Sequence, residues 1–175
     1  MSRRSILFAL FASVTLAFGV LTAVPASADP VDPLTVSVDK SSAGPGETVT
    51  VEVTFTNPQA VDLTFSYLSF QPEWQSEVGD ADFDLTSCTG DVSFCSVTGS
   101  PGGHSGYMTH DVVIEPADTR TATFTYQVDP EEDCEGLHMY VQYSFYTYYE
   151  SSAGNVGQIV SHVLGDDLPA TFIDC

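Results

Sequence analysis

The sequence has very few basic residues. Its 175 residues include 4 Lys and Arg against 24 Asp and Glu, which gives a formal net charge of −20 at pH 7. Arg3 and Arg4 lie in an N-terminal stretch without acidic residues, so the rest of the chain has 2 basic residues, Lys40 and Arg120, against 24 acidic ones, or −22. Such a charge repels phosphate backbones and anionic lipid headgroups. We therefore expect no nucleic-acid partner and no binding to membrane surfaces.

The sequence also lacks the residue spacings of common catalytic and metal sites. It contains no CxxC pair and no HExxH, and no His stands near the cysteines at zinc-finger spacing. A zinc site is therefore disfavoured. The Gly-rich segment around Ser105 is not a nucleophile elbow, whose Ser must top a strand-to-helix turn. We expect no catalytic activity, and the enzymatic alternative is a secreted hydrolase whose Ser, His and Asp come together from distant positions.

The N-terminus has the three parts of a secretory signal peptide. Arg3 and Arg4 precede an almost wholly apolar stretch over 6–24, and Ala26-Ser27-Ala28 follows as a small-residue cleavage site. The apolar stretch is also long enough for a membrane anchor, but the cleavage triplet and the strand-like sequence after it favour export. We predict a signal peptide over 1–28 and one secreted domain over 29–175, with no membrane association after cleavage.

After the leader, apolar and polar residues alternate with a period of two, and no amphipathic helix is evident. Turn residues, among them Gly44-Pro45-Gly46 and Asn57-Pro58, separate the alternating stretches. The alternation places Leu63, Phe65 and Tyr67 on one face of their strand. The sequence predicts strands over 34–39, 49–55, 61–70, 110–115, 121–128, 138–149, and 157–164 with 170–173. About seven short strands with turns between them are typical of an all-β, antiparallel β-sandwich.

Two stretches of alternating residues are Leu34 to Asn57, LTVSVDKSSAGPGETVTVEVTFTN, and Ile114 to Val128, IEPADTRTATFTYQV. The first resembles the first two strands of bacterial immunoglobulin-like modules of the adhesion-related and conserved-repeat type, and the second resembles a mid-domain strand of the same modules. The resemblance implies an immunoglobulin-like sandwich on a secreted or surface protein, and it implies no catalytic residue. Such a domain needs about 100 residues. Most of the additional length falls in 71–106, which we predict to be an ordered insertion.

Cysteine usage predicts two disulfides. The chain has four cysteines, Cys88, Cys95, Cys134 and Cys175. An even number in an exported chain favours disulfides, for which three connectivities are possible. Cys88 and Cys95 flank a short segment centred on Gly90-Asp91, so a disulfide across a hairpin is geometrically easy. This pairing leaves Cys134 for Cys175.

The short loop between Cys88 and Cys95 is also similar to one in the enediyne-binding apoproteins of actinomycetes. Those proteins are exported, acidic sandwiches with two disulfides. The similarity implies an alternative function, that of a small-molecule carrier, which would need a cavity lined by aromatic side chains.

Three alternating aspartates are the one candidate for a metal site. Asp80, Asp82 and Asp84 offer the carboxylate oxygens that calcium prefers. An EF-hand would need Gly where Leu85 stands, so calcium, the only cofactor considered, would bind outside that motif. The alternative is a strand whose aspartates face water while the residues between them face the core.

Tyrosines on the long strand over 138–149 are the candidate recognition residues. The period of two places Tyr140, Tyr146 and Tyr148 on one face and Val141, Tyr143 and Phe145 on the other. Exposed tyrosines on a rigid sheet offer apolar area with a polar tip and little entropy to lose. We predict that this face binds an extracellular protein or a glycan. The alternative is that the face is covered, for example by the insertion.

Overall fold

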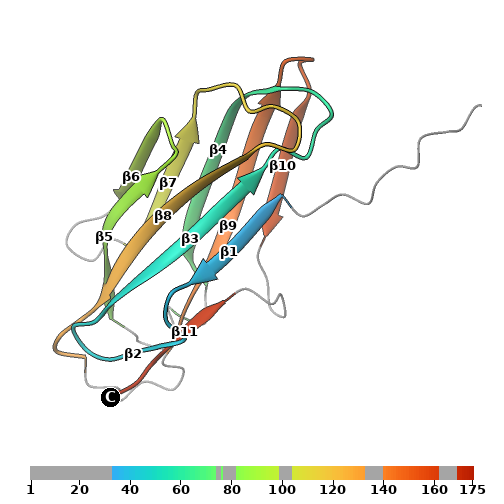
Figure 1. Cartoon of the computed structure of the whole chain (residues 1–175). Helices are drawn as coiled ribbons and strands as arrows, with labels where there is room; N and C mark the ends of the chain where they lie inside the picture. The colour runs from blue at the N-terminus through green and yellow to red at the C-terminus, as the bar shows by residue number, and fades with distance from the viewer. Residues whose placement is uncertain (1–32, 74–75, 77–81, 99–103, 133–139, 162–168) are drawn as a thin grey trace, which may run out of the picture.

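In the computed structural model of the protein, two β-sheets pack face to face as a sandwich (Figure 1). The structure describes residues 33–73, 76, 82–98, 104–132, 140–161 and 169–175. The predicted signal peptide over 1–28 lies outside these residues. In the part of the chain that is described, no helix is both long and apolar enough to cross a bilayer.

The four-stranded sheet is antiparallel and has the order β1-β3-β8-β5. Its strands are β1 (Leu34–Val38), β3 (Thr48–Thr56), β8 (Thr119–Val128) and β5 (Phe83–Gly90). β3 and β8 show the predicted alternation, because every second side chain is buried and the residues between them face outward. The turn before β3 also forms as predicted, with Gly46 at a φ of 77° that favours glycine.

The seven-stranded sheet has the order β2-β11-β9-β4-β7-β6, with β10 also paired to β9. Its strands are β2 (Ser42–Ala43), β4 (Leu63–Pro72), β6 (Phe94–Thr98), β7 (Ser105–His110), β9 (Tyr140–Ser151), β10 (Val156–Ser161) and β11 (Ala170–Ile173). Neighbouring strands are antiparallel except for β2 and β11, which are parallel. The fold is therefore an all-β, immunoglobulin-like sandwich with more strands than the sequence pattern predicts.

Aromatic side chains from both sheets fill the space between them. Phe70 of β4 stacks on Phe124 of β8 with ring centroids 4.1 Å apart. Tyr143 of β9 contacts Phe124 edge to face at 4.8 Å. These side chains are at most 4% exposed, so the two sheets share one continuous hydrophobic core.

The segment 71–106 accounts for most of the additional strands. Within it, β5 joins the four-stranded sheet, while β6 and the start of β7 join the seven-stranded sheet. The strand predicted over 110–115 is wrong, because β7 already ends at His110 and only Ile114 makes an isolated bridge, to Leu63. The chain crosses here from one sheet to the other, so it has to leave the ladder of β7 before it enters β8.

The outer face of the four-stranded sheet is covered with hydroxyl groups. Thr54 and Thr121 lie opposite each other on β3 and β8, and their Oγ1 atoms are 3.0 Å apart. Thr89 of β5 contacts Thr123 in the same way at 3.1 Å. Threonine is common on strands, and its hydroxyl group makes this sheet surface polar, as a solvent-facing sheet requires.

Candidate functional site

The three predicted tyrosines lie on the outer face of the seven-stranded sheet. Tyr140, Tyr146 and Tyr148 are half-buried on β9, and Val141, Tyr143 and Phe145 on the other face of the strand are buried. The described part of segment 71–106 does not cover them, because its strands β6 and β7 lie in the same sheet on the far side of β4.

A β-bulge brings two further rings to this outer face. The register of β4 against β9 shifts between Leu63 and Phe65. Leu63 therefore points into the core, whereas Phe65 and Tyr67 point outward, and the expectation that all three share a face is wrong. A bulge inserts one unpaired residue, here Thr64, and so reverses the facing of every residue after it.

Two more rings come from the strands of segment 71–106. Tyr107 on β7 is half-buried, and Phe94 on the edge strand β6 is 49% exposed. No strand was expected at either position. Six side chains from four neighbouring strands thus form what we call the aromatic face: Phe65, Tyr67, Phe94, Tyr107, Tyr146 and Tyr148.

The rings of the aromatic face contact one another across the strands. Tyr107 lies between Phe94 and Tyr67, with centroid distances of 5.5 and 5.7 Å. Tyr148 is directly opposite Tyr67 in the ladder and contacts Phe65 edge to face at 6.4 Å. These distances are those of favourable aromatic pairs, so the rings are held in place before any ligand binds.

Tyr140, the third predicted tyrosine, is separate from this group. It lies at the opposite end of β9 and contacts Phe172 of β11, with centroids 6.1 Å apart. Phe172 is 61% exposed. The two rings form a smaller apolar spot near the C-terminus.

One carboxylate lies at the border of the aromatic face. The Tyr148 hydroxyl donates a hydrogen bond of 2.7 Å to Glu150 Oε1. This bond, with a smaller effect of burial, raises the pKa of Tyr148. The phenol therefore stays protonated at neutral pH and keeps its hydrogen-bonding tip without adding charge.

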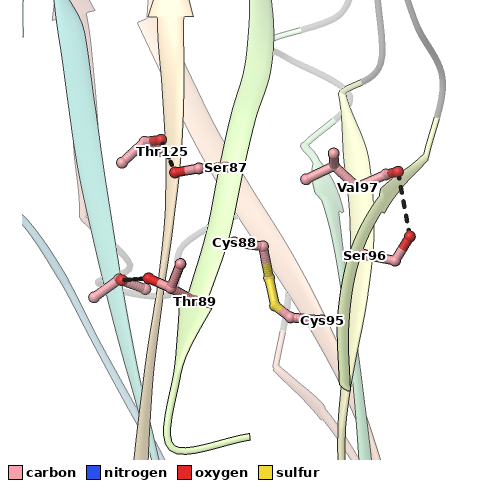
Figure 2. Close-up of a disulfide and its surroundings, with 8 residues drawn as sticks. Ser87, Cys88, Thr89, Cys95, Ser96, Val97 and Thr125 are labelled. Carbon is pink, nitrogen blue, oxygen red and sulfur yellow. Dashed lines mark hydrogen bonds between the residues drawn. A yellow bond between two sulfur atoms is a disulfide. The ribbon is translucent and has the colours of Figure 1, made fainter. Parts of the chain in front are cut away.

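The Cys88–Cys95 disulfide is present (Figure 2), but, contrary to the sequence prediction, it does not join the two strands of a hairpin. Cys88 is on β5 and Cys95 is on β6, and these strands belong to different sheets. Between them the Asp91 N–H bonds to Thr121 of the four-stranded sheet and the Ser93 N–H to Thr109 of the other. The bond therefore joins the two sheets at one edge of the sandwich, with Cα atoms 5.7 Å apart.

The second predicted disulfide involves Cys134, which lies outside the described residues. Its predicted partner, Cys175, has its Sγ 3.9 Å from the carbonyl oxygen of Glu132. The C-terminus thus lies close to Glu132, and the pairing of Cys134 with Cys175 stays a prediction.

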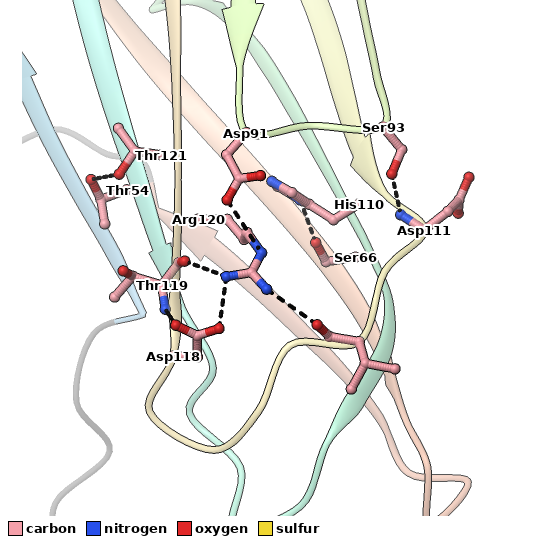
Figure 3. Close-up of polar contacts among 11 residues, drawn as sticks. Thr54, Ser66, Asp91, Ser93, His110, Asp111, Asp118, Thr119, Arg120 and Thr121 are labelled. Atoms are coloured by element: carbon pink, nitrogen blue, oxygen red, sulfur yellow. Dashed lines mark hydrogen bonds and ion pairs between the residues drawn. The ribbon is translucent and has the colours of Figure 1, made fainter.

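Arg120 links three segments at the opposite end of the sandwich (Figure 3). Its guanidinium bonds to Asp118 at 2.7 Å and to the carbonyl oxygens of Thr119 and Val113 at 2.8 and 3.2 Å. It also pairs with Asp91, between β5 and β6, at 3.4 Å. The hydrogen bond from Arg120, followed by one from the Thr119 N–H, lowers the pKa of Asp118.

A Ser–His contact beside Arg120 bears on the hydrolase alternative. His110 Nδ1 lies 2.8 Å from Ser66 Oγ (Figure 3), and the two residues face each other across β7 and β4. Both are at most 2% exposed, so no substrate reaches the hydroxyl. Burial lowers the pKa of His110 and outweighs the opposing effect of Asp91. This pair is a buried cross-strand contact and not a nucleophile with its base.

The structure describes two of the three aspartates of the calcium hypothesis. Asp82 and Asp84 are exposed while Phe83 and Leu85 are buried, which is the alternating strand of the alternative interpretation. Asp80 lies outside the described residues. No group of three or more potential metal ligands occurs among the residues that the structure describes.

A small cavity between β1 and β9 bears on the carrier alternative. Measured for the centre of a water molecule, its volume is about 10 Å³, which is room for about one water. Burial raises the pKa of Tyr126 to about 12 and outweighs a hydrogen bond with Thr171, and burial also raises the pKa of Tyr143. Both rings line this cavity, which is too small for a polycyclic ligand.

Sequence comparison and structure comparison give different results. No protein-family model and no curated protein matches the sequence. A cohesin module from a Clostridium perfringens family 33 glycoside hydrolase matches the structure with a TM-score of 0.53 and 11% identity, over 81% of this chain and 95% of that one. The sixth cohesin of Acetivibrio cellulolyticus scaffoldin B, solved in complex with a dockerin, matches with a TM-score of 0.51 and 11% identity, over 81% and 99%.

The N-terminal domain of a Streptococcus gordonii adhesin is also similar, with a TM-score of 0.55 and 9% identity over 83% of this chain. The match spans 33% of the adhesin chain. At these identities the likeness shows the fold alone. The chain is thus an immunoglobulin-like sandwich of the kind that bacterial cohesins and adhesins use. That fold agrees with the resemblance in the sequence.

Proposed function

We propose that the protein is a secreted, non-catalytic recognition module and that the aromatic face is its binding surface. The observation that carries the proposal is that six aromatic side chains from four neighbouring strands lie on one outer sheet surface, five of them in ring contact with a neighbour. Large exposed apolar patches are uncommon on soluble proteins and usually mark contact sites. A cohesin that was solved in complex with a dockerin shares this fold, and so does an adhesin domain. Both similarities support a binding role.

The proposal is tested by removing rings on β9. In the double variant Tyr146→Ser with Tyr148→Ser, we expect the fold to remain, because both side chains are only half-buried on the outer face. Binding should be measured on an array of cell-wall glycans, other polysaccharides and extracellular proteins. We expect the wild type to bind at least one component and the variant to lose that signal.

A matched control changes the opposite face of the sandwich. Glu52→Ser with Thr89→Ser alters two exposed residues of the four-stranded sheet and should leave binding unchanged. The proposal fails if the aromatic variant folds and binds like the wild type. It also fails if that variant unfolds, since the tyrosines would then be structural residues.

A further inference from the structure

The acidic residues are distributed unevenly over the sandwich. The chain has 24 of them, yet in the strands of the seven-stranded sheet Glu150 is the only one. These strands contain no Lys or Arg, and their one histidine, His110, is buried. The aromatic face is therefore a nearly uncharged surface on a domain whose loops and ends are strongly negative.

Around the rings, the outer face carries hydroxyl and amide groups. Ser69 separates Tyr107 from Tyr146 in one row of the ladder, and Thr109 separates Phe94 from Tyr67 in the next. Gln158 continues the second row on β10, opposite Tyr148. From β6 to β10 this row crosses four strand spacings of about 4.8 Å, or about 19 Å in all.

From this arrangement we infer that the ligand of the aromatic face is a neutral polysaccharide, an inference that rests on the proposed function. Each face of a sugar ring carries C–H groups that stack on an aromatic ring, while its hydroxyls project sideways toward groups such as those of Ser69, Thr109 and Gln158. The row is long enough to hold several sugar rings. Because the tyrosine rings are already packed against their neighbours, binding immobilises few side chains.

The charge distribution argues against other ligands. A net charge of −22 repels anionic polymers at long range. A basic protein would be attracted to the acidic loops and ends rather than to this face, since electrostatic complementarity directs association. Of these three kinds of ligand, only a neutral one can bind the aromatic face without being repelled by the net charge or attracted to the acidic loops and ends.

Affinity electrophoresis of the whole secreted domain tests the inference. Gels would contain a soluble β-glucan, a xylan or a mannan, with carboxymethylated glucan as the anionic counterpart and lysozyme as a basic protein probe in solution. We expect retardation by at least one neutral polysaccharide, with little change between low and physiological salt. The anionic polymer should bind more weakly, and any binding to lysozyme should weaken strongly with salt.

Variants connect that binding to the face. Tyr67→Thr with Tyr107→Thr should weaken it by about tenfold or more, as expected for central aromatic contacts, while Glu52→Ser with Thr89→Ser should not. If the double variant unfolds, Phe94→Thr gives the same test at the exposed edge. The inference is overturned if no neutral polysaccharide binds, or if binding survives in the folded variants. A protein ligand that is lost with the same rings would overturn it and still leave the proposed function standing.

Discussion

Lys40 and Arg120, the two basic residues of the sandwich domain, provide a controlled test of what holds the two sheets together at one end. Arg120→Met and Lys40→Met remove one positive charge each, so they change the net charge equally. The Arg120 side chain is 17% exposed and joins three segments, whereas the Lys40 side chain is 35% exposed and pairs with Glu47. Any difference in stability between the two variants therefore reports local structure and not overall charge.

The magnitude follows from the bonds that Arg120 makes. Its two bonds to backbone carbonyl oxygens, of Thr119 and Val113, contribute about 1–1.5 kcal/mol each. Methionine keeps the packing of the aliphatic stem. The ion pairs of Arg120 with exposed carboxylates are left out of the sum because water screens them. The expected loss is thus about 2–3 kcal/mol, or about 5–10 °C in Tm for a domain of this size. Lys40→Met should lower Tm by less than about 2 °C.

Differential scanning calorimetry at fixed pH and salt measures both values. If the two variants lose the same amount of stability, the effect of Arg120 is one of overall charge, and the argument from its hydrogen bonds is refuted. Arg120→Lys separates the contributions further. It keeps the charge but not the planar fork that reaches both carbonyl groups, and should therefore recover only part of the loss.

Two further predictions concern the disulfide and the buried histidine. Cys88→Ser with Cys95→Ser opens a loop with a sequence separation of 7. The loop-closure model predicts that this change lowers the free energy of unfolding by about 2.4 kcal/mol. A calorimetric loss of stability no larger than that of Lys40→Met would contradict this. His110 has a lowered pKa in the folded state, so below about pH 6.5 the unfolded chain takes up a proton that the folded chain does not. The stability of the wild type relative to His110→Gln, measured by urea unfolding, should therefore shrink as the pH falls from about 7.5 to 5, and parallel pH profiles would contradict it.

Much of the fold could be predicted because exposed strands follow a simple alternation. In β3 and in β8 from Thr121 onward, every second residue is apolar, and all of those residues are buried. The strands of segment 71–106 follow no such pattern. β5 has two polar residues together, Thr86 and Ser87, where its register against β8 shifts, and β7 contains Gly106, whose backbone packs against Phe70 and leaves no room for a side chain.

The candidate site could be predicted only in part, for a related reason. Tyr146 and Tyr148 lie on a regular strand, so their common face follows from spacing alone. Phe65 and Tyr67 face outward because of a bulge at Thr64, and a bulge changes facing without a marker in the residue pattern. Phe94 and Tyr107 come together through long-range strand pairing, which local sequence does not encode.

The position of the Cys88–Cys95 bond also determines how the domain would respond to a pulling force. A chain stretched from its ends transmits tension through the bond between the two sulfur atoms, so residues 89–94 carry none of it. Seven residue steps at about 3.4 Å each would extend to about 24 Å, whereas the two Cα atoms are held 5.7 Å apart. The oxidised domain is therefore about 18 Å shorter at full extension than the reduced one, and a stretched module keeps this loop, with Phe94 inside it, closed.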